Sequence, residues 1–494
     1  MVPASTATGR RPFLAGVAGL AVTIPGRVAG DATATDEAFE PRAHLPVDGL
    51  MEAVADESGE VVYGAVSDGF AAVDVSDPAD PRSLAERRDV LADVGGPLEY
   101  AWDLDVDGDR LLIHGPASFN AYEAFALFDV SDPADPRRVA HYETGHRTHN
   151  ACIADGVVYL TGTGVARRPV VVVDVSDDDP REIARFTPSD YGHAPRKIHD
   201  VYVHEDVLYA CYWDLGTWLV DVSDPTDPTP IVRLGFDRSE GAVDSDVLPG
   251  NDHYAEPRPD GDVLAVGKEV FDRGASGDEA PGGIELWNVS DPADATREAI
   301  LAPPSPVGVD GGRTAHNFGW RGNRLYTSWY SGGVRVFEVS DPADPHLLAS
   351  WQDDGTSFWT AQPIHEGFVG ADHAGPLGDD EEGSGLYVFP EPSGDGEPAE
   401  TMDPLAPVAV TTEFREPGAG RTPEETPTPS ETPTPTGTPS PTPDGTPTPT
   451  SEDTPTPGVT PTSTPTDSPG FGVPAALAAG GLATWRLLAR RTEE

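Results

Sequence analysis

The chain has 494 residues, of which 84 are acidic and 32 are basic, for a formal net charge of −52. This excess of carboxylates is spread along the whole sequence and excludes a nucleic-acid-binding protein, which would need a basic surface. The only two cysteines, Cys152 and Cys211, exclude a disulfide framework, and both lie in apolar runs that favour buried free thiols.

The density and even spread of the carboxylates resemble those of proteins from extreme halophiles, in which acidic side chains retain water and counterions. The charge then reports the environment of the protein and carries no information about a substrate.

Residues 1–35 combine a basic pair with a short apolar run. Arg10 and Arg11 precede Phe13, Leu14 and a weakly apolar Ala/Gly/Val stretch that is too short for a membrane span. This order resembles a twin-arginine signal peptide, which implies export of an already folded protein. The alternative is an arbitrary basic N-terminus.

A short acidic motif recurs between the two ends. Its copies begin at Asp74, Asp129, Asp174, Asp221, Asn288 and Glu338, and read DVSDPADP, DVSDPADP, DVSDDDP, DVSDPTDP, NVSDPADA and EVSDPADP. GLYVFP at 385–390 is a seventh copy without the turn. Self-similarity at this spacing indicates stacked units such as propeller blades, and seven is an ordinary number of blades.

The unit at 198–236 contains four strand-like runs, IHDVYV, VLYACYW, TWLVDV and PIVRLGF, separated by the turn signals HED, DLG and SDPTDP. Four consecutive antiparallel strands form one blade, in which we name the strands A to D from the axis outward. The motif is then the turn between strands C and D, because Asp and Ser cap backbone amides and the prolines fix φ. We therefore expect it to be part of the scaffold.

The runs VVVVDVSD (170–177), WLVDVSDP (218–225) and VRVFEVSDP (334–342) resemble the LVIVD repeat family over most of residues 40–390. The resemblance implies an all-β, seven-bladed β-propeller of four-stranded antiparallel blades. It implies no particular activity, because the family has no agreed one.

A propeller must join its two ends, since open sheet edges would otherwise remain. EPRAHLPV at 40–47 resembles the turn and strand D of other units, such as DPRRVAHY, and we expect it to supply the outer strand of the last blade. PLAPVAVTTEF at 404–414 is the competing candidate. The propeller is thus predicted to span residues 36–414.

The residues that begin strand A are the candidate site. His149-Asn150, His199-Asp200, His253-Tyr254 and His316-Asn317 occupy one repeat position, where other units have Trp102-Asp103 and Trp359-Thr360. Four imidazoles near the axis could bind a divalent transition metal, with Asp103 and Asp200 as ligands or supporting acceptors. The alternative is that each His bonds to a neighbouring blade, in a channel too wide for shared coordination.

Long acidic loops at 236–252, 271–283 and 371–385 are expected to rim one mouth of the channel, together with His193 and Arg196. They indicate either a surface for a cation or basic partner, or hydrated loops without a ligand.

Two weaker motifs remain. The spacing of Asp103–Asp109 resembles the start of a calcium loop, but the segment fits a strand and DG turn better. Asn288 begins a glycosylation sequon.

The C-terminal part changes composition twice. Residues 415–468 are dominated by Thr and Pro and are predicted to be a disordered, O-glycosylated stalk. In 469–494, Pro469, Gly470 and Phe471 precede a weak apolar run and three arginines, which resembles the PGF-CTERM signal of haloarchaeal surface proteins. The resemblance implies cleavage by an archaeosortase and attachment to a lipid; the alternative is a plain membrane helix.

These features predict a propeller held at the outer face of the cell, which binds a ligand or an envelope protein through its loop-rich face. The alternative is a metal-dependent enzyme, a hydrolase or an oxidoreductase, that uses the axial histidines. A structural part of the envelope is a third possibility. No nucleophile elbow, phosphate-binding loop or dinucleotide fingerprint is present, so the sequence leans toward a non-catalytic role without a certain cofactor.

Overall fold

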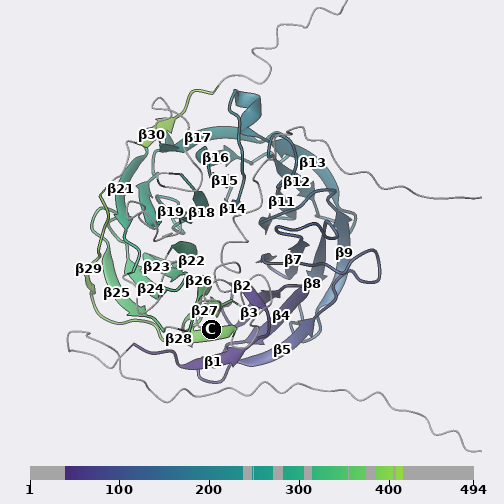
Figure 1. The fold of residues 1–494 in the computed structure, drawn as a ribbon, viewed down its shortest axis with the longest axis horizontal. Coiled ribbons are helices and arrows are strands. Elements are labelled where there is room, and N and C mark those ends of the chain that lie inside the picture. Colours follow the sequence, from purple (N-terminus) through teal and green to yellow (C-terminus); the bar gives the residue numbers. More distant parts are fainter. Residues whose placement is uncertain are drawn as a thin grey trace, which may run out of the picture. The chain divides into compact units, whose positions relative to one another are not determined.

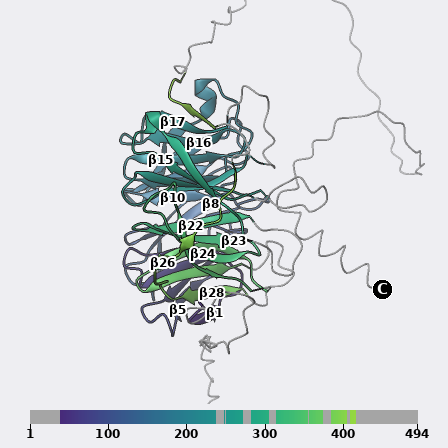
Figure 2. The same cartoon turned by 90° about the vertical axis from the view of Figure 1, so that its left-hand side faces the viewer.

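The computed structural model describes residues 39–236, 248, 250–270, 282–304, 314–353, 355–373, 384–403 and 408–414. All of them belong to one compact unit that ends at Pro417. Their strands form seven antiparallel sheets arranged as blades around a central axis (Figure 1; seen from the side in Figure 2). The predicted seven-bladed β-propeller is confirmed.

Blades one to six each use consecutive strands in the order A to D. Blades one to three are β2 (Leu50–Ala55), β3 (Val61–Val66), β4 (Gly69–Asp74) and β5 (Arg82–Arg87); β6 (Leu104–Asp107), β7 (Arg110–Gly115), β8 (Ala124–Asp129) and β9 (Arg137–Glu143); and β10 (Ala151–Ala154), β11 (Val157–Thr161), β12 (Val170–Asp174) and β13 (Arg181–Phe186).

Blades four to six are β14 (Asp200–His204), β15 (Val207–Tyr212), β16 (Gly216–Asp221) and β17 (Thr229–Phe236); β18 (Asp252–Pro257), β19 (Val263–Lys268), β20 (Ile284–Asn288) and β21 (Thr296–Leu301); and β22 (Ala315–Arg321), β23 (Arg324–Trp329), β24 (Gly333–Glu338) and β25 (His346–Trp351). Two 3₁₀ turns, Pro188–Tyr191 and Pro292–Asp294, are the helical elements of the described residues.

Blade seven consists of β26 (Phe358–Ile364), β27 (Gly367–Asp372), β28 (Gly385–Phe389) and the N-terminal strand β1 (Ala43–Pro46). β1 pairs antiparallel with β28, Leu45 opposite Leu386, so the predicted closure by the N-terminal segment is confirmed. The competing segment lies elsewhere: its strand β30 (Val408–Thr411) pairs with β17 of blade four.

After blade seven, the chain runs back along the outer edges of three blades. β29 (Glu397–Pro398) pairs with β25 of blade six, Thr401 bridges to Leu301 of blade five, and β30 follows on blade four. We call residues 397–403 and 408–411 the C-terminal strap. It pairs with outer strands whose edges would otherwise be exposed.

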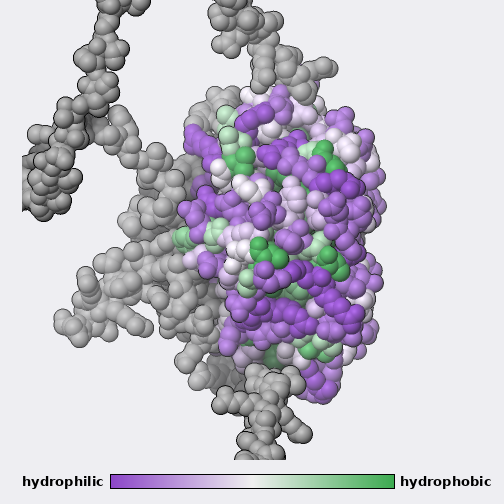
Figure 3. Space-filling model, turned by 90° about the vertical axis from the view of Figure 1, so that its right-hand side faces the viewer, coloured by the Kyte–Doolittle hydropathy of each residue, from purple (hydrophilic) through white to green (hydrophobic). Residues whose placement is uncertain are grey.

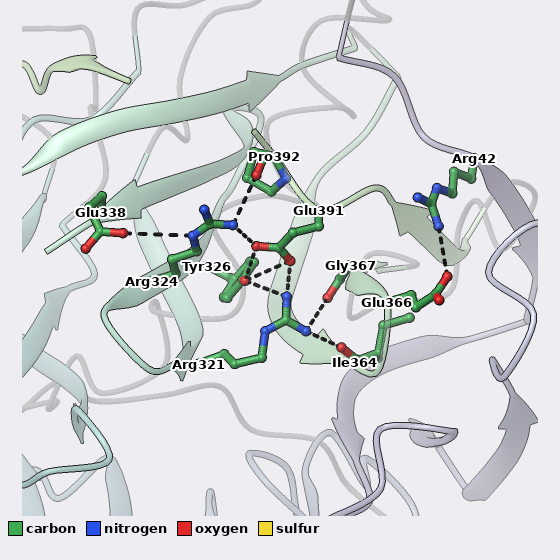
Figure 4. A network of polar contacts seen from close by, with 10 residues as sticks. All are labelled: Arg42, Arg321, Arg324, Tyr326, Glu338, Ile364, Glu366, Gly367, Glu391 and Pro392. Carbon is green, nitrogen blue, oxygen red and sulfur yellow. Dashed lines mark hydrogen bonds and ion pairs between the residues drawn. The ribbon is translucent and has the colours of Figure 1, made fainter. Parts of the chain in front are cut away.

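The start of this return path is held by a polar network around Glu391 (Figure 4). Its carboxylate pairs with Arg321 and Arg324 and accepts a hydrogen bond from the Tyr326 hydroxyl at 2.9 Å. These partners come from β22 and β23, so the network ties blade six to the chain that leaves blade seven.

The recurrent motif is the C–D turn, as predicted. In blade one, Asp74 Oδ1 accepts hydrogen bonds from the Ser76 amide at 3.0 Å and the Ser76 hydroxyl at 2.6 Å. The same pair of bonds recurs at Asp129, Asp174 and Asp221, and Asn288 makes it with Ser290 in blade five. The motif is therefore a repeated cap on exposed turns.

The core lies between neighbouring blades, where alternate residues of each strand face the next sheet. Phe70 of blade one meets Phe128 of blade two edge to face at 4.9 Å, within an apolar cluster shared by both blades. Cys152 and Cys211 are buried free thiols, as expected. The outer surface in Figure 3 is mostly hydrophilic with small, separate apolar spots, which agrees with the acidic composition.

Candidate functional site

Six aromatic side chains form a closed ring around the axis at the start of strand A. Successive ring centroids lie 4.2 Å apart between His149 and His199, 4.0 Å between His199 and His253, and 4.4 Å between His253 and His316. Trp359 continues the ring at 4.3 Å from His316, and Trp102 closes it at 6.3 Å from Trp359 and 6.2 Å from His149. We call these six residues the axial ring.

β-Bulges bring these side chains inward. The register between strands A and B shifts between Asp252 and Tyr254, between Ala315 and Phe318, and between Phe358 and Thr360, so the skipped residues include His253, His316 and Trp359. A bulge inserts an extra residue and re-aims the side chains beside it. Because neighbouring imidazole centroids lie 4.0–4.4 Å apart, the alternative of a channel too wide for neighbouring rings to share a ligand is wrong.

The hydrogen bonds of the four imidazoles differ. His316 Nδ1 lies 2.6 Å from the carbonyl oxygen of Trp359 in the next blade, and His149 Nδ1 lies 2.6 Å from Asn150 Oδ1. The structural alternative thus accounts for part of the ring. It does not account for His253, which is 1% exposed and finds no hydrogen-bond partner for either ring nitrogen among the described residues.

Among the described residues, two groups of three side chains have their ligand atoms within 4.8 Å of one another: His199, Asp200 and His253, and His253, Glu269 and His316. Burial lowers the pKa of His199, His253 and His316 well below the usual value, and neighbouring imidazoles add to the effect. These rings are therefore neutral at pH 7 and have lone pairs for a metal.

Next to the axial ring lies a cavity of about 210 Å³, which we call the acid chamber. Strand A supplies its walls. Its polar lining consists of the carboxyl groups of Glu52, Asp103, Asp105, Asp200 and Glu256, the amides of Asn317 and Gln362, and Tyr202, Tyr254 and Cys152. None of the described residues that line it is Lys or Arg.

Burial makes Glu52, Asp105 and Glu256 weaker acids than usual. It raises the pKa of Glu52 to about 8, with a further contribution from the charge of Asp103, although Asn317 donates a hydrogen bond to Glu52 at 2.7 Å. Burial likewise raises the pKa of Glu256 to about 8 and that of Asp105 to about 7. These three carboxyl groups are therefore protonated to a large extent at pH 7.

Asp103 has a different role from the one expected for a ligand. Its Oδ2 accepts the Ala151 amide at 2.9 Å and lies 3.0 Å from His114 Nε2, and His114 is fully buried. The carboxylate thus links blade two to blade three. The segment Asp103–Asp109 forms β6 and a tight turn at Gly108, as predicted.

His193 and Arg196 lie on the loop before β14, outside the axial ring and the acid chamber. The His193 ring meets Trp218 edge to face at 5.2 Å, and the Arg196 amide donates to Asp214 at 3.0 Å. The neighbouring Lys197 is closer to the axis: its ammonium lies 3.8 Å from the centroid of Trp213, which stacks on His199.

The remaining candidates are at the surface or outside the described residues. Asn288 is exposed, so its role as a glycan acceptor stays a prediction. The long loops at 237–247, 271–281 and 374–383, the export arginines Arg10 and Arg11, the stalk and Pro469–Phe471 lie outside the described residues.

Sequence reasoning missed Glu52, Asp105, Glu256 and Glu269. The sequence carried a signal for the first three. Glu52 follows Met51 as Asp103 follows Trp102, so it occupies the same repeat position as Asp103. Asp105 and Glu256 lie two residues after that position in their own blades, on the same face of strand A. Glu269 follows β19 and has no counterpart in the aligned positions. Only the structure shows that Glu269 lies close to His253 of blade five and His316 of blade six.

Among the residues that the structure describes, no helix is long and apolar enough to cross a membrane.

No curated protein matches the sequence. Similar solved structures include the β-propeller domain of Cps50 (Swd1) from Myceliophteria thermophila, with 11% identity over 70% of this chain and 98% of that one. The RRP9 WD40 repeats have 13% identity over 69% and 94%, and a chain of a mitotic checkpoint complex has 13% over 74% and 100%; the TM-score is 0.47 in all three cases.

The family model of the LVIVD repeat matches residues 58–87 and 195–233. These matches cover strands B to D of blade one and most of blade four. Together with the seven antiparallel sheets, they show that the chain is a seven-bladed β-propeller that contains LVIVD repeats.

Proposed function

We propose that this propeller is a binding module at the outer face of an archaeal cell envelope, and that its acid chamber binds a hard cation such as Ca²⁺. One observation carries the proposal. Asp200 Oδ2 and Asn317 Oδ1 are buried oxygens for which the described residues provide no hydrogen-bond partner, and both residues line the chamber. Buried acceptors are normally satisfied, and a cation satisfies several at once.

The donor set favours a hard cation. The chamber offers carboxylate, amide and phenol oxygens, with the buried thiol of Cys152 as its one sulfur. Burial raises the pKa of that thiol well above its usual value, so it stays protonated and is a poor ligand. Ca²⁺ takes six to eight oxygen ligands from such groups and from water.

The sequence supports the location. The twin-arginine-like pair Arg10-Arg11, the Thr/Pro stalk and the PGF segment form the order expected of a haloarchaeal protein that is exported folded and held by a lipid or helix. Replacing both arginines by lysine should leave the protein inside the cell, whereas the unaltered chain fractionates with the envelope. Equal export of the two forms would contradict this part of the proposal.

Calcium binding tests the chamber. In the full chain, Glu52→Gln should weaken Ca²⁺ binding at least tenfold at pH 8, because it removes one buried charge and preserves the shape of the side chain. In the unaltered protein, Ca²⁺ binding should weaken up to tenfold for each unit of pH below about 8, because the cation must then displace a proton from Glu52. Titration calorimetry in concentrated NaCl, which screens the surface carboxylates, measures both effects.

Glu397→Gln is the matched control, since it removes an exposed carboxylate of the strap. It should bind Ca²⁺ as the unaltered chain does. If Glu52→Gln and Glu397→Gln bind alike, the ions are held by the acidic surface and not by the chamber.

A further inference from the structure

A second group of ligand atoms lies between blades five and six, apart from the oxygens of the acid chamber. His253 belongs to the bulge of β18, Glu269 follows the end of β19, and His316 belongs to the bulge of β22. Their ligand atoms all lie within 4.8 Å of one another, and His253 Nε2 is 3.6 Å from Glu269 Oε2. One ion between them would reach all three.

His253 is the residue that a structural role explains least. Its side chain is 1% exposed, and within the part of the chain that the structure describes neither ring nitrogen has a hydrogen-bond partner. Burying an imidazole without such partners costs free energy. A metal ion at one nitrogen would remove that cost.

The other two ligands are already oriented. Since a carbonyl oxygen can only accept, His316 Nδ1 must carry its proton and donate to Trp359, 2.6 Å away, which leaves Nε2 with a lone pair. Tyr330 bonds to the carboxyl group of Glu269, and its ring packs 4.7 Å from that of His316. Metal ligands in proteins typically have such outer partners, which fix the tautomer and direction of the ligand.

A described cation, Lys197, lies near this group. Its ammonium is 3.8 Å from the centroid of Trp213, which stacks on His199, and its charge also acts on the carboxyl group of Glu269. The two imidazoles bind a metal as neutral ligands, whereas burial raises the pKa of Glu269 to about 8, so a bound ion would displace the proton of its carboxyl group.

We propose that His253, Glu269 and His316 bind one divalent transition-metal ion, with Zn²⁺ as the probe. Two imidazoles and one carboxylate form a ligand set that zinc accepts while a fourth position stays open. Ca²⁺ would prefer the oxygen-lined chamber. The site is independent of the proposed calcium function, because it uses different side chains.

Equilibrium dialysis of the full chain against Zn²⁺ in concentrated NaCl, followed by elemental analysis, tests the assignment. The unaltered protein should retain one Zn²⁺ per chain. His253→Phe should lose it, because phenylalanine fills the ring position without a ligating nitrogen, and Glu269→Gln should bind at least tenfold more weakly. Thermal unfolding with and without Zn²⁺ gives a second readout, in which the ion stabilises only chains that bind it.

His149→Phe is the matched control, since His149 belongs to the same ring but to neither ligand group. It should keep the Zn²⁺, as should Glu52→Gln, whose loss of Ca²⁺ binding is then separable from this site. Equal retention by the unaltered chain and His253→Phe would overturn the proposal. So would loss in His199→Phe with full retention in Glu269→Gln, since the ion would then belong to His199, Asp200 and His253.

Discussion

Replacing Lys268 by methionine is expected to destabilise the propeller by about 3–5 kcal/mol, as breaking buried ion pairs does in general. Lys268 is 2% exposed at the end of β19. Its ammonium pairs with Asp252 and lies 3.4 Å from Glu285, and Arg297 bonds to the other oxygen of Glu285 at 2.7 Å. Methionine fills the volume but leaves two buried carboxylates with a single cation.

The lysine is charged in the folded protein. Burial lowers the pKa of Lys268, but the charges of Asp252 and Glu285 outweigh burial and raise the pKa overall. Urea denaturation of the unaltered chain and of the variant at pH 7 and equal salt measures the loss. Arg82→Met, which removes an exposed ion pair with Asp80, is the control and should leave the unfolding midpoint unchanged. Equal midpoints for the two variants would show that the buried group is not stabilising.

Replacing Leu45 by alanine is expected to cost about 2–5 kcal/mol, because it removes a buried side chain from the strand that closes the ring. Leu45 is 2% exposed and belongs to the apolar cluster shared by blades seven and one. β1 has only four residues, so few other contacts hold it to β28. The loss should open blade seven first.

Thermal unfolding and hydrogen exchange of β28 measure this effect. His44→Ala is the control, because His44 is the neighbour on the opposite face of β1 and stacks on Tyr387 at 4.2 Å. Loss of that contact should cost about 1 kcal/mol. A Leu45→Ala protein no less stable than His44→Ala would show that β1 does not close the propeller energetically.

Much of this architecture could be predicted from sequence because the repeat carries its own register. Counting from the motif at Asp74 placed the strands of the blades and identified residues 40–47 as the closing strand. The prediction rested on alternation and turn chemistry, which are local properties of the chain. Residues 404–414 were harder to place, since their strand pairs with the edge of a blade more than 170 residues earlier in the sequence.

The sequence predicts that four histidines of the axial ring share one repeat position, but it does not predict that their rings are in contact. The four residues are His149, His199, His253 and His316. The distance between their rings depends on β-bulges, which no residue pattern in the sequence indicated. Glu269 follows strand B of blade five and has no counterpart at the aligned positions. Sequence therefore suggested nitrogen ligands, and the structure added the carboxylate that makes a three-residue site.

The C-terminal strap gives the propeller a mechanical property. Its last strand, β30, holds blade four through the pairs Arg233–Thr411 to Phe236–Val408, and the contacts with blades five and six lie earlier in the chain. A pull from the C-terminal side therefore loads blade four first, then Thr401, then β29, one short contact at a time. The ring of blades bears tension only after these contacts and the network around Glu391 have separated, so the strap acts as a series of links that yield before the blades do.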